Sequence, residues 1–327
     1  MPFREANLRK GSDHKEFVGT CNKRVTKNRY HPYIEGQMAI VTHKCHLSNL
    51  HDPYLILGPF FIEIKDYWPF KSIIHDFFTN REMAWIIKYS KPRLSRARRA
   101  TTKEELSSNI NVVTKAVQTW IDDIKYTENE TLKLIRNEKG NLVYEALRLH
   151  DPYDFKIADR LLLDISQRIE LVTRLNVTSR NGATKYQTTN YGLGGLLKPH
   201  LDPYGYEQGD NTLIERRSHL SRTGDKVATF MGWMNSVAEG GATAFTHNGY
   251  NELLEPRKGS AAFWINLTSC HKRDYRTKHG GCPVLKGSKW ILNKWIYSWD
   301  QWKEIPCDVT PRTTLLPDHG IPSYLDA

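Results

Sequence analysis

The residues whose types and spacing could do chemistry are His200 and Asp202, followed by His279 and Lys289. Side chains two residues apart lie on the same face of an extended strand, so His200 and Asp202 can bind one ion together. Two histidines and one carboxylate on one face are the ligand set of non-haem Fe(II) oxygenases, and they leave the opposite face open for a co-substrate and O2. Lys289 would then hold a carboxylate of that co-substrate. A His-x-Asp pattern alone is common, so the surrounding sequence has to support this interpretation.

Four short runs rich in aromatic and β-branched residues predict strands around these positions. They are KYQTTNYG, KVATFMGWMN, GSAAFWINL and SKWILNKWIY, and glycine- and proline-containing turn signals separate them. Thr79 and Glu82 have capping-box spacing ahead of a helix that should end before Pro92. An apolar stripe predicts a second helix over residues 156–175. The sequence therefore predicts an α+β, mainly β fold, with a double-stranded β-helix (jelly roll) core and flanking N-terminal helices.

Shifts in composition divide the chain into four regions. Residues 1–58 are polar and are expected to form an irregular N-terminal segment, followed by a helical support region over residues 59–175. Residues 176–307 contain the predicted strands and the candidate metal ligands, and residues 308–327 form a tail. The polar stretch 204–224 directly follows the metal motif and is longer than ordinary connections, which favours a lid over the site.

The composition restricts the class of protein. The 327 residues are 39% apolar and can bury a large core. No run approaches the ~18 apolar residues of a membrane helix, so no membrane span is expected. The net charge is +11, but the basic residues are scattered without a recognisable binding motif, so no nucleic-acid partner is expected. The first residues show no secretory signal, whereas three sequons, at Asn129, Asn176 and Asn266, would matter only in the secretory pathway.

This chain resembles the catalytic domain of collagen prolyl 4-hydroxylase α subunits in four motifs that stand in the same order: YQTTNYGLGGLLKPHLD, RTGDKVATFMGWMNSVAEGGATAF, PRKGSAAFWINL and DYRTKHGGCPVLKGSKWILNKWIY. The segment KPRLSRA at residues 91–97 is also similar to that family. The resemblance is strong over residues 185–307 and thinner over residues 17–120. Several independent motifs in one order are far more specific than His-x-Asp alone.

The resemblance implies an enzyme that binds Fe(II), uses 2-oxoglutarate and O2 as co-substrates, and needs ascorbate to sustain activity. On the family's pattern, His200, Asp202 and His279 match the iron ligands, and Lys289 matches the lysine for the distal carboxylate of 2-oxoglutarate. Lys294 is the other candidate for binding this carboxylate, but the family's spacing from the second histidine favours Lys289.

Three further residues are candidates for the co-substrate site. Tyr191 could orient 2-oxoglutarate or line the site, and it could equally be a core aromatic. Thr229 and Thr243 could contact the co-substrate, although buried threonines in strands commonly serve only packing.

The five cysteines include no C-x-x-C pair, which argues against a zinc ribbon, and their spacing alone leaves thiols and disulfides open. The resemblance implies a disulfide between Cys282 and Cys307 and another between Cys21 and Cys45, with Cys270 left as a buried thiol. Paired cysteines imply an oxidising compartment, hence the lumen of the endoplasmic reticulum. This conflicts with the missing secretory signal, and the cysteines and sequons carry more weight.

The activity implied is conversion of peptidyl proline in collagen-like X-Pro-Gly sequences to 4-hydroxyproline, with release of succinate and CO2. One alternative is a hydroxylase of the same fold that acts on another side chain, such as lysine. Lys289 favours the prolyl branch, because lysyl hydroxylases resemble this fold but use arginine there. The other alternative is a non-catalytic peptide-binding or assembly subunit, and an intact His-Asp-His-Lys set argues against it.

The chain also departs from the family. It is too short to contain both the N-terminal assembly region and the helical peptide-binding domain of the α subunits. Residues 122–155 look like an insertion or a divergent replacement. VTKAVQTWI, which includes Trp120, only loosely matches a family stretch near the substrate groove. A collagen-like proline-rich peptide is still the expected substrate, but these departures indicate that the choice of peptide can differ from the family's. The resemblance also implies protein disulfide isomerase as a β subunit.

Overall fold

The structure is a computed structural model that describes residues 12–22, 44–48, 57–67, 69–96, 116–121, 132–136, 142–146, 152–179, 181–205, 220, 223–247 and 250–305. Its helical elements are α1 (Ser12–Cys21), α2 (Asn80–Ser90), α4 (Pro152–Thr173) and the short 3₁₀ turns η2 (Lys91–Arg93), η4 (Tyr275–Thr277) and η5 (Trp299–Gln301). Most of the predicted lid, most of the insertion and the tail lie outside the described residues. The proposed domain boundaries therefore stay predictions.

The strands run from the N-terminal part of the chain to residue 297. They are β1 (Lys44–Ser48), β2 (Phe60–Tyr67), β3 (Phe70–His75), β4 (Ser95–Arg96), β5 (Val117–Ile121), β6 (Leu132–Arg136), β7 (Leu142–Ala146), β8 (Tyr186–Tyr191), β9 (Leu197–His200), β10 (Lys226–Trp233), β11 (Glu239–Gly240), β12 (Thr243–His247), β13 (Tyr250–Leu254), β14 (Ala261–Ile265), β15 (His279–Gly281), β16 (Val284–Lys286) and β17 (Lys289–Tyr297). All four runs that predicted strands form them, as β8, β10, β14 and β17.

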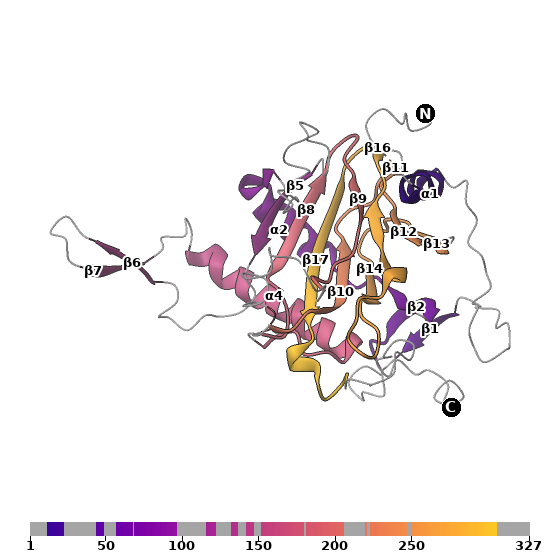
Figure 1. The fold of residues 1–327 in the computed structure, drawn as a ribbon. Coiled ribbons are helices and arrows are strands. Elements are labelled where there is room, and N and C mark those ends of the chain that lie inside the picture. Colours follow the sequence, from indigo (N-terminus) through magenta and orange to yellow (C-terminus); the bar gives the residue numbers. More distant parts are fainter. Residues whose placement is uncertain are drawn as a thin grey trace.

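Two antiparallel sheets make up the core. The larger has the order β1-β2-β3-β14-β10-β17-β8-β5-β4, and the smaller has the order β13-β12-β15-β9. Strands β11 and β16 pair with each other, as do β6 and β7. In Figure 1, α2 and α4 lie beside the large sheet, and α1 lies next to β12 and β13. This arrangement confirms the predicted jelly roll with flanking helices.

The large sheet turns one face to the helices and the other to the candidate site, because side chains alternate along each strand. On β10, Phe230 packs in the core with α2 and α4, whereas its neighbour Met231 packs in the core between the two sheets. On β14, Phe263 likewise packs in the core with the helices, and Trp264 packs in the core between the sheets. This alternation decides which residues of each strand can reach the cavity between the sheets.

Both predicted helices form. Thr79 Oγ1 accepts a hydrogen bond from the Glu82 backbone N–H, and the Glu82 carboxylate accepts one from the Thr79 N–H. Helix α2 ends at Ser90, ahead of Pro92, as predicted. Helix α4 begins four residues earlier than expected, and Ile165, Ile169 and Val172 of its apolar stripe are fully buried. No helix in the described parts of the chain is long and apolar enough to cross a membrane.

Both implied disulfides are wrong where the structure tests them. Cys21 is bonded to Cys282, and Cys45 is an exposed free thiol on the edge strand β1. Since Cys282 is bonded to Cys21, it cannot pair with Cys307, which lies outside the described residues. Cys270 is also a free thiol, but it is half-buried and lies 3.4 Å from the Thr268 hydroxyl.

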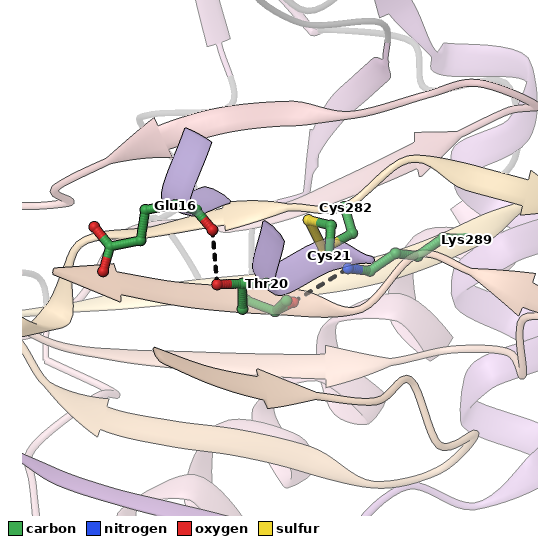
Figure 2. Close-up of a disulfide and its surroundings, with 6 residues drawn as sticks. Glu16, Thr20, Cys21, Cys282 and Lys289 are labelled. Atoms are coloured by element: carbon green, nitrogen blue, oxygen red, sulfur yellow. Dashed lines mark hydrogen bonds between the residues drawn. A yellow bond between two sulfur atoms is a disulfide. The ribbon is translucent and has the colours of Figure 1, made fainter. Parts of the chain in front are cut away.

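Helix α1 explains the observed pairing. The N-terminal segment was expected to be irregular, but Phe17 on α1 packs with Ala242, Ala244 and Cys282 against the smaller sheet. The contact is close, because a Cβ added to Gly280 would lie 2.9 Å from the Phe17 ring. Figure 2 shows that the resulting disulfide lies near Lys289 on β17. Through Phe17, helix α1 therefore packs against Gly280 on β15, the strand that also carries His279.

Removing this disulfide should destabilise the protein. The bond joins residues 261 positions apart in the sequence, and loss of a native disulfide typically costs about 2–5 kcal/mol. Helix α1 has ten residues, too few to be stable without its packing. In urea denaturation, Cys21→Ala should lower the unfolding midpoint, whereas Cys45→Ala should leave it unchanged. The opposite ranking of these two variants would contradict the pairing of Cys21 with Cys282.

Candidate metal centre and co-substrate site

His200, Asp202 and His279 come together between the two sheets. Their potential ligand atoms all lie within 4.8 Å of one another, and no other group of this kind occurs in the described part of the chain. Strands β9 and β15 pair so that His200 stands directly opposite His279, which puts both rings on one face. The Asp202 carboxylate lies 3.5 Å from His200 Nε2 and 3.7 Å from His279 Nε2. The predicted triad is thus assembled by strand register.

Both imidazoles are oriented by backbone carbonyls. His200 Nδ1 lies 3.0 Å from the Lys198 carbonyl oxygen, and His279 Nδ1 lies 2.9 Å from that of Thr277. A carbonyl can only accept, so each Nδ1 carries the hydrogen and each Nε2 keeps its lone pair for a metal. Burial lowers the pKa of His279 to about 4, although the charge of Asp202 opposes this. His279 is therefore neutral at neutral pH, the form that binds metals.

The Asp202 carboxylate is ionised and firmly held. Burial alone would raise its pKa, but the charge of His279, the hydrogen bond and charge of His200 and the charge of Lys226 together lower the pKa below its ordinary value. Thr229 donates a hydrogen bond to Asp202 Oδ2 at 2.7 Å. Thr229 thus contacts the candidate metal-binding carboxylate, and its predicted contact with the co-substrate stays a prediction. Two imidazole nitrogens and one carboxylate, all within reach of one ion, fit Fe(II).

Lys289 places a buried ammonium group in the same cavity. Its side chain is 2% exposed, and its Nζ donates to the Thr243 hydroxyl at 3.2 Å and lies 5.7 Å from the centre of the Tyr191 ring. Burial lowers its pKa to about 7, and the charge of Glu255 opposes the shift. Among the described residues, no carboxylate forms an ion pair with this ammonium. A buried cation that faces a cavity needs an anion, and a carboxylate of a bound ligand can supply it.

Lys294 does not compete for this role. It lies five positions after Lys289, and an odd spacing on a strand puts the two side chains on opposite faces. Its Nζ donates to the Thr184 carbonyl at 2.9 Å and lies 4.2 Å from the centre of the Tyr186 ring. Lys294 does not line the cavity, whereas Lys289, Tyr191, Thr229 and Thr243 do.

The cavity has a volume of about 690 Å³ and extends well beyond the metal ligands. Its outer part is lined by Trp120 and Trp295, whose ring centres are 6.0 Å apart, and by Lys226, which lies over the Trp295 ring at 4.6 Å. Sequence reasoning missed Trp295 and Lys226. Counting in steps of two from Lys289 along β17 would have found Trp295.

Asn266 was also missed, because its sequon drew attention to glycosylation. The side chain is fully buried on the cavity side of the sheet, and its Nδ2 donates to Thr229 Oγ1 at 2.8 Å. A glycan cannot be attached to this amide in the folded protein. Asn266 follows Trp264 by two residues, so the strand period would have placed both side chains on one face.

Comparison with known proteins agrees with the site. Residues 186–297 match the family described as the 2OG-Fe(II) oxygenase superfamily. Prolyl 4-hydroxylase subunit alpha-1 of Mus musculus is 32% identical over 261 residues, which cover 79% of this chain and 40% of that protein. Subunit alpha-3 of Mus musculus is 29% identical over 267 residues, covering 82% of this chain and 41% of that protein. The resemblance drawn from the four motifs is thereby confirmed.

This chain spans about two fifths of the length of these curated relatives. Among solved structures, the viral collagen prolyl hydroxylase from Paramecium Bursaria Chlorella virus-1 is 17% identical, with a TM-score of 0.39; the match covers 69% of this chain and 95% of that one. A prolyl-4-hydroxylase from Pseudomonas putida is 15% identical, with a TM-score of 0.35, and the match covers 69% of this chain and 91% of that one.

Proposed function

We propose, from the match of residues 186–297 to the 2OG-Fe(II) oxygenase superfamily, that the chain is a prolyl 4-hydroxylase-like dioxygenase. Its reaction would convert 2-oxoglutarate to succinate and CO2 and peptidyl proline in X-Pro-Gly sequences to 4-hydroxyproline. The observation that carries the proposal is the convergence of two histidines, one carboxylate and the buried Lys289 in one cavity.

Each residue of the site has a definite part in this reaction. Fe(II), with 2-oxoglutarate and O2, supplies the oxidising chemistry when bound. His200, Asp202 and His279 would hold the metal, and Lys289 would pair with the distal carboxylate of 2-oxoglutarate, assisted by the Thr243 hydroxyl. Phe245 and Trp264 pack on the His279 ring at centroid distances of 5.4 and 4.9 Å. These apolar rings exclude water from one side of the centre.

The outer cavity supports a peptide substrate. Trp120 is 47% exposed at its rim and stands beside Trp295, which provides an aromatic surface of the kind that binds proline-rich segments in the polyproline II conformation. Such segments leave their backbone carbonyls free. Gln187 and Asn293 line the same part of the cavity and can donate hydrogen bonds to them.

The proposal extends to the cellular setting. The disulfide between Cys21 and Cys282 supports an oxidising compartment, and we propose the lumen of the endoplasmic reticulum. The similar curated proteins are named as alpha subunits, which supports assembly with a second subunit. Protein disulfide isomerase is the proposed β subunit, and ascorbate is the proposed reductant that sustains turnover. Co-purification of a second chain with the protein expressed in a secretory host tests the assembly.

Turnover with a Pro-Pro-Gly repeat peptide tests the reaction. The protein with Fe(II), 2-oxoglutarate and ascorbate should release succinate faster when the peptide is present, and tandem mass spectrometry should place one added oxygen on proline. If the added oxygen were found on lysine in a mixed-sequence peptide, the assignment of proline as the substrate would be wrong. Absence of turnover with any peptide, despite bound Fe(II), would favour a non-catalytic subunit.

The aromatic rim predicts a selective effect on peptide use. Because truncation of a tryptophan at a binding surface commonly costs more than about 1.4 kcal/mol, Trp120→Ala should raise the KM for the peptide about tenfold. The KM for 2-oxoglutarate should not change, since Lys289 holds that ligand. Trp302→Ala is the matched control, because Trp302 is 67% exposed and does not line the cavity. Equal peptide KM values for the two variants would contradict the proposed rim.

A further inference from the structure

We propose that Thr229 and Asn266 act as a two-residue positioning relay that makes Asp202 bind the metal through one carboxylate oxygen only. The inference rests on the proposed metal site and goes beyond it, because neither residue can be a metal ligand in this arrangement. Thr229 lies on β10 and Asn266 directly follows β14, the neighbouring strand of the large sheet.

The contacts form one directed chain. Thr229 Oγ1 lies 2.7 Å from Asp202 Oδ2, and Asn266 Nδ2 lies 2.8 Å from Thr229 Oγ1. An ionised carboxylate can only accept, so the single hydroxyl hydrogen of Thr229 must point to Asp202. The hydroxyl oxygen can then only accept from Asn266, which fixes the side-chain amide with its nitrogen toward Thr229. The relay therefore donates twice in the same direction, toward the carboxylate.

The backbone holds both members of the relay in place. The Asn266 N–H donates to the Val227 carbonyl at 2.7 Å, and its own carbonyl accepts from the Asp274 N–H at 3.0 Å. Thr229 is paired with Trp264 on one side and Trp295 on the other. Thr229 is 2% exposed and Asn266 is fully buried, so water does not compete for these hydrogen bonds.

This arrangement decides how the carboxylate can meet a metal. Oδ2 accepts the Thr229 hydroxyl hydrogen at 2.7 Å and also lies 3.7 Å from His279 Nε2, whereas Oδ1 lies 3.5 Å from His200 Nε2. Binding of a metal through one carboxylate oxygen would leave more of its coordination positions for 2-oxoglutarate and O2 than binding through both oxygens. By engaging Oδ2, the relay would favour binding through Oδ1 and would orient the carboxylate.

Metal affinity tests the relay without any turnover. Thr229→Val keeps the shape of the side chain but removes the hydroxyl, and it should raise the dissociation constant for Mn(II) about 10- to 100-fold. Thr229→Ser should restore near-native affinity, because it restores the donor. The matched control is Thr188→Val, because Thr188 is equally buried, lies outside the cavity, and has no hydrogen-bond partner for its hydroxyl among the described residues.

Infrared difference spectra on Mn(II) binding test the coordination mode. The separation of the symmetric and antisymmetric carboxylate stretches should be wide in the native protein and Thr229→Ser, and narrower in Thr229→Val, as one-oxygen binding gives way to two. If Thr229→Val does not fold, Thr229→Cys, a weak donor of similar size, replaces it in the comparison with Thr229→Ser.

The outcomes separate the two claims. Unchanged Mn(II) affinity and spectra in a folded Thr229→Val protein would overturn the relay and leave the metal site intact. Failure of the native protein to bind Mn(II) would overturn the proposed site itself. Asn266→Ala should shift affinity in the same direction as Thr229→Val but by less, because Thr229 keeps its hydroxyl and loses only the group that orients it.

Discussion

Replacing His279 with alanine should abolish 2-oxoglutarate turnover. The variant removes one of the three proposed ligands from a site where His279 stands directly opposite His200 on paired strands. Changes to groups that merely support a metal ligand cost about 10- to 100-fold in affinity or activity, so loss of a ligand should cost at least about 100-fold in both. Calorimetric titration with Mn(II) and assay of succinate release measure the two effects.

A second histidine separates this effect from general damage. His75 lies on β3, interacts with Glu63 and does not line the cavity. His75→Ala should therefore retain metal binding and turnover, whatever its effect on stability. The proposed ligand set would be wrong if His279→Ala bound Mn(II) as tightly as the native protein while His75→Ala did not.

Lys289→Ala should selectively weaken binding of 2-oxoglutarate. Truncating one partner of a buried charge pair costs about 2–5 kcal/mol, so the dissociation constant for 2-oxoglutarate should rise on the order of 100-fold or more. Metal affinity should persist, because Lys289 touches Thr243 and Tyr191 rather than the ligands. Titration of the Mn(II)-loaded protein with 2-oxoglutarate measures the change.

The protonation of Lys289 adds a pH signature. Burial sets its pKa at about 7 in the free protein, and a bound carboxylate would raise it. Only the ammonium form of Lys289 pairs with the carboxylate. The affinity of the native protein for 2-oxoglutarate should therefore fall as the pH rises from the pKa of Lys289 in the free protein toward its higher pKa in the complex. Lys289→Ala should not show this lysine-dependent fall. Lys294→Met is the matched control, and a loss of 2-oxoglutarate affinity there, but not in Lys289→Ala, would reverse the assignment.

Much of the fold and site followed from local periodicity. The capping box at Thr79 and Glu82 fixed the start of α2, and the alternating strand runs appeared as β8, β10, β14 and β17. The same period of two explains why His200 and Asp202 converge. It also separates Lys289 from Lys294 without any family spacing, since five positions on a strand reverse the face.

Tertiary contacts account for what the sequence did not predict. The pairing of Cys21 with Cys282 depends on Phe17 packing against the smaller sheet, which no local pattern of residues specifies. Thr229 was predicted as a possible co-substrate contact, but its hydrogen bond from Asn266 depends on the pairing of β10 with β14. Hydrogen-bond partners across strands follow from register, and register is not visible in a single strand.

The most direct test of the proposed centre is an anaerobic titration of the protein with Fe(II) and 2-oxoglutarate, followed by visible absorption. We expect a charge-transfer band that saturates at one equivalent each of Fe(II) and 2-oxoglutarate and is lost in His279→Ala. In Lys289→Ala, the band should require far more 2-oxoglutarate. A native protein that shows no band, or a band of equal strength in His279→Ala, would contradict the assignment of this site.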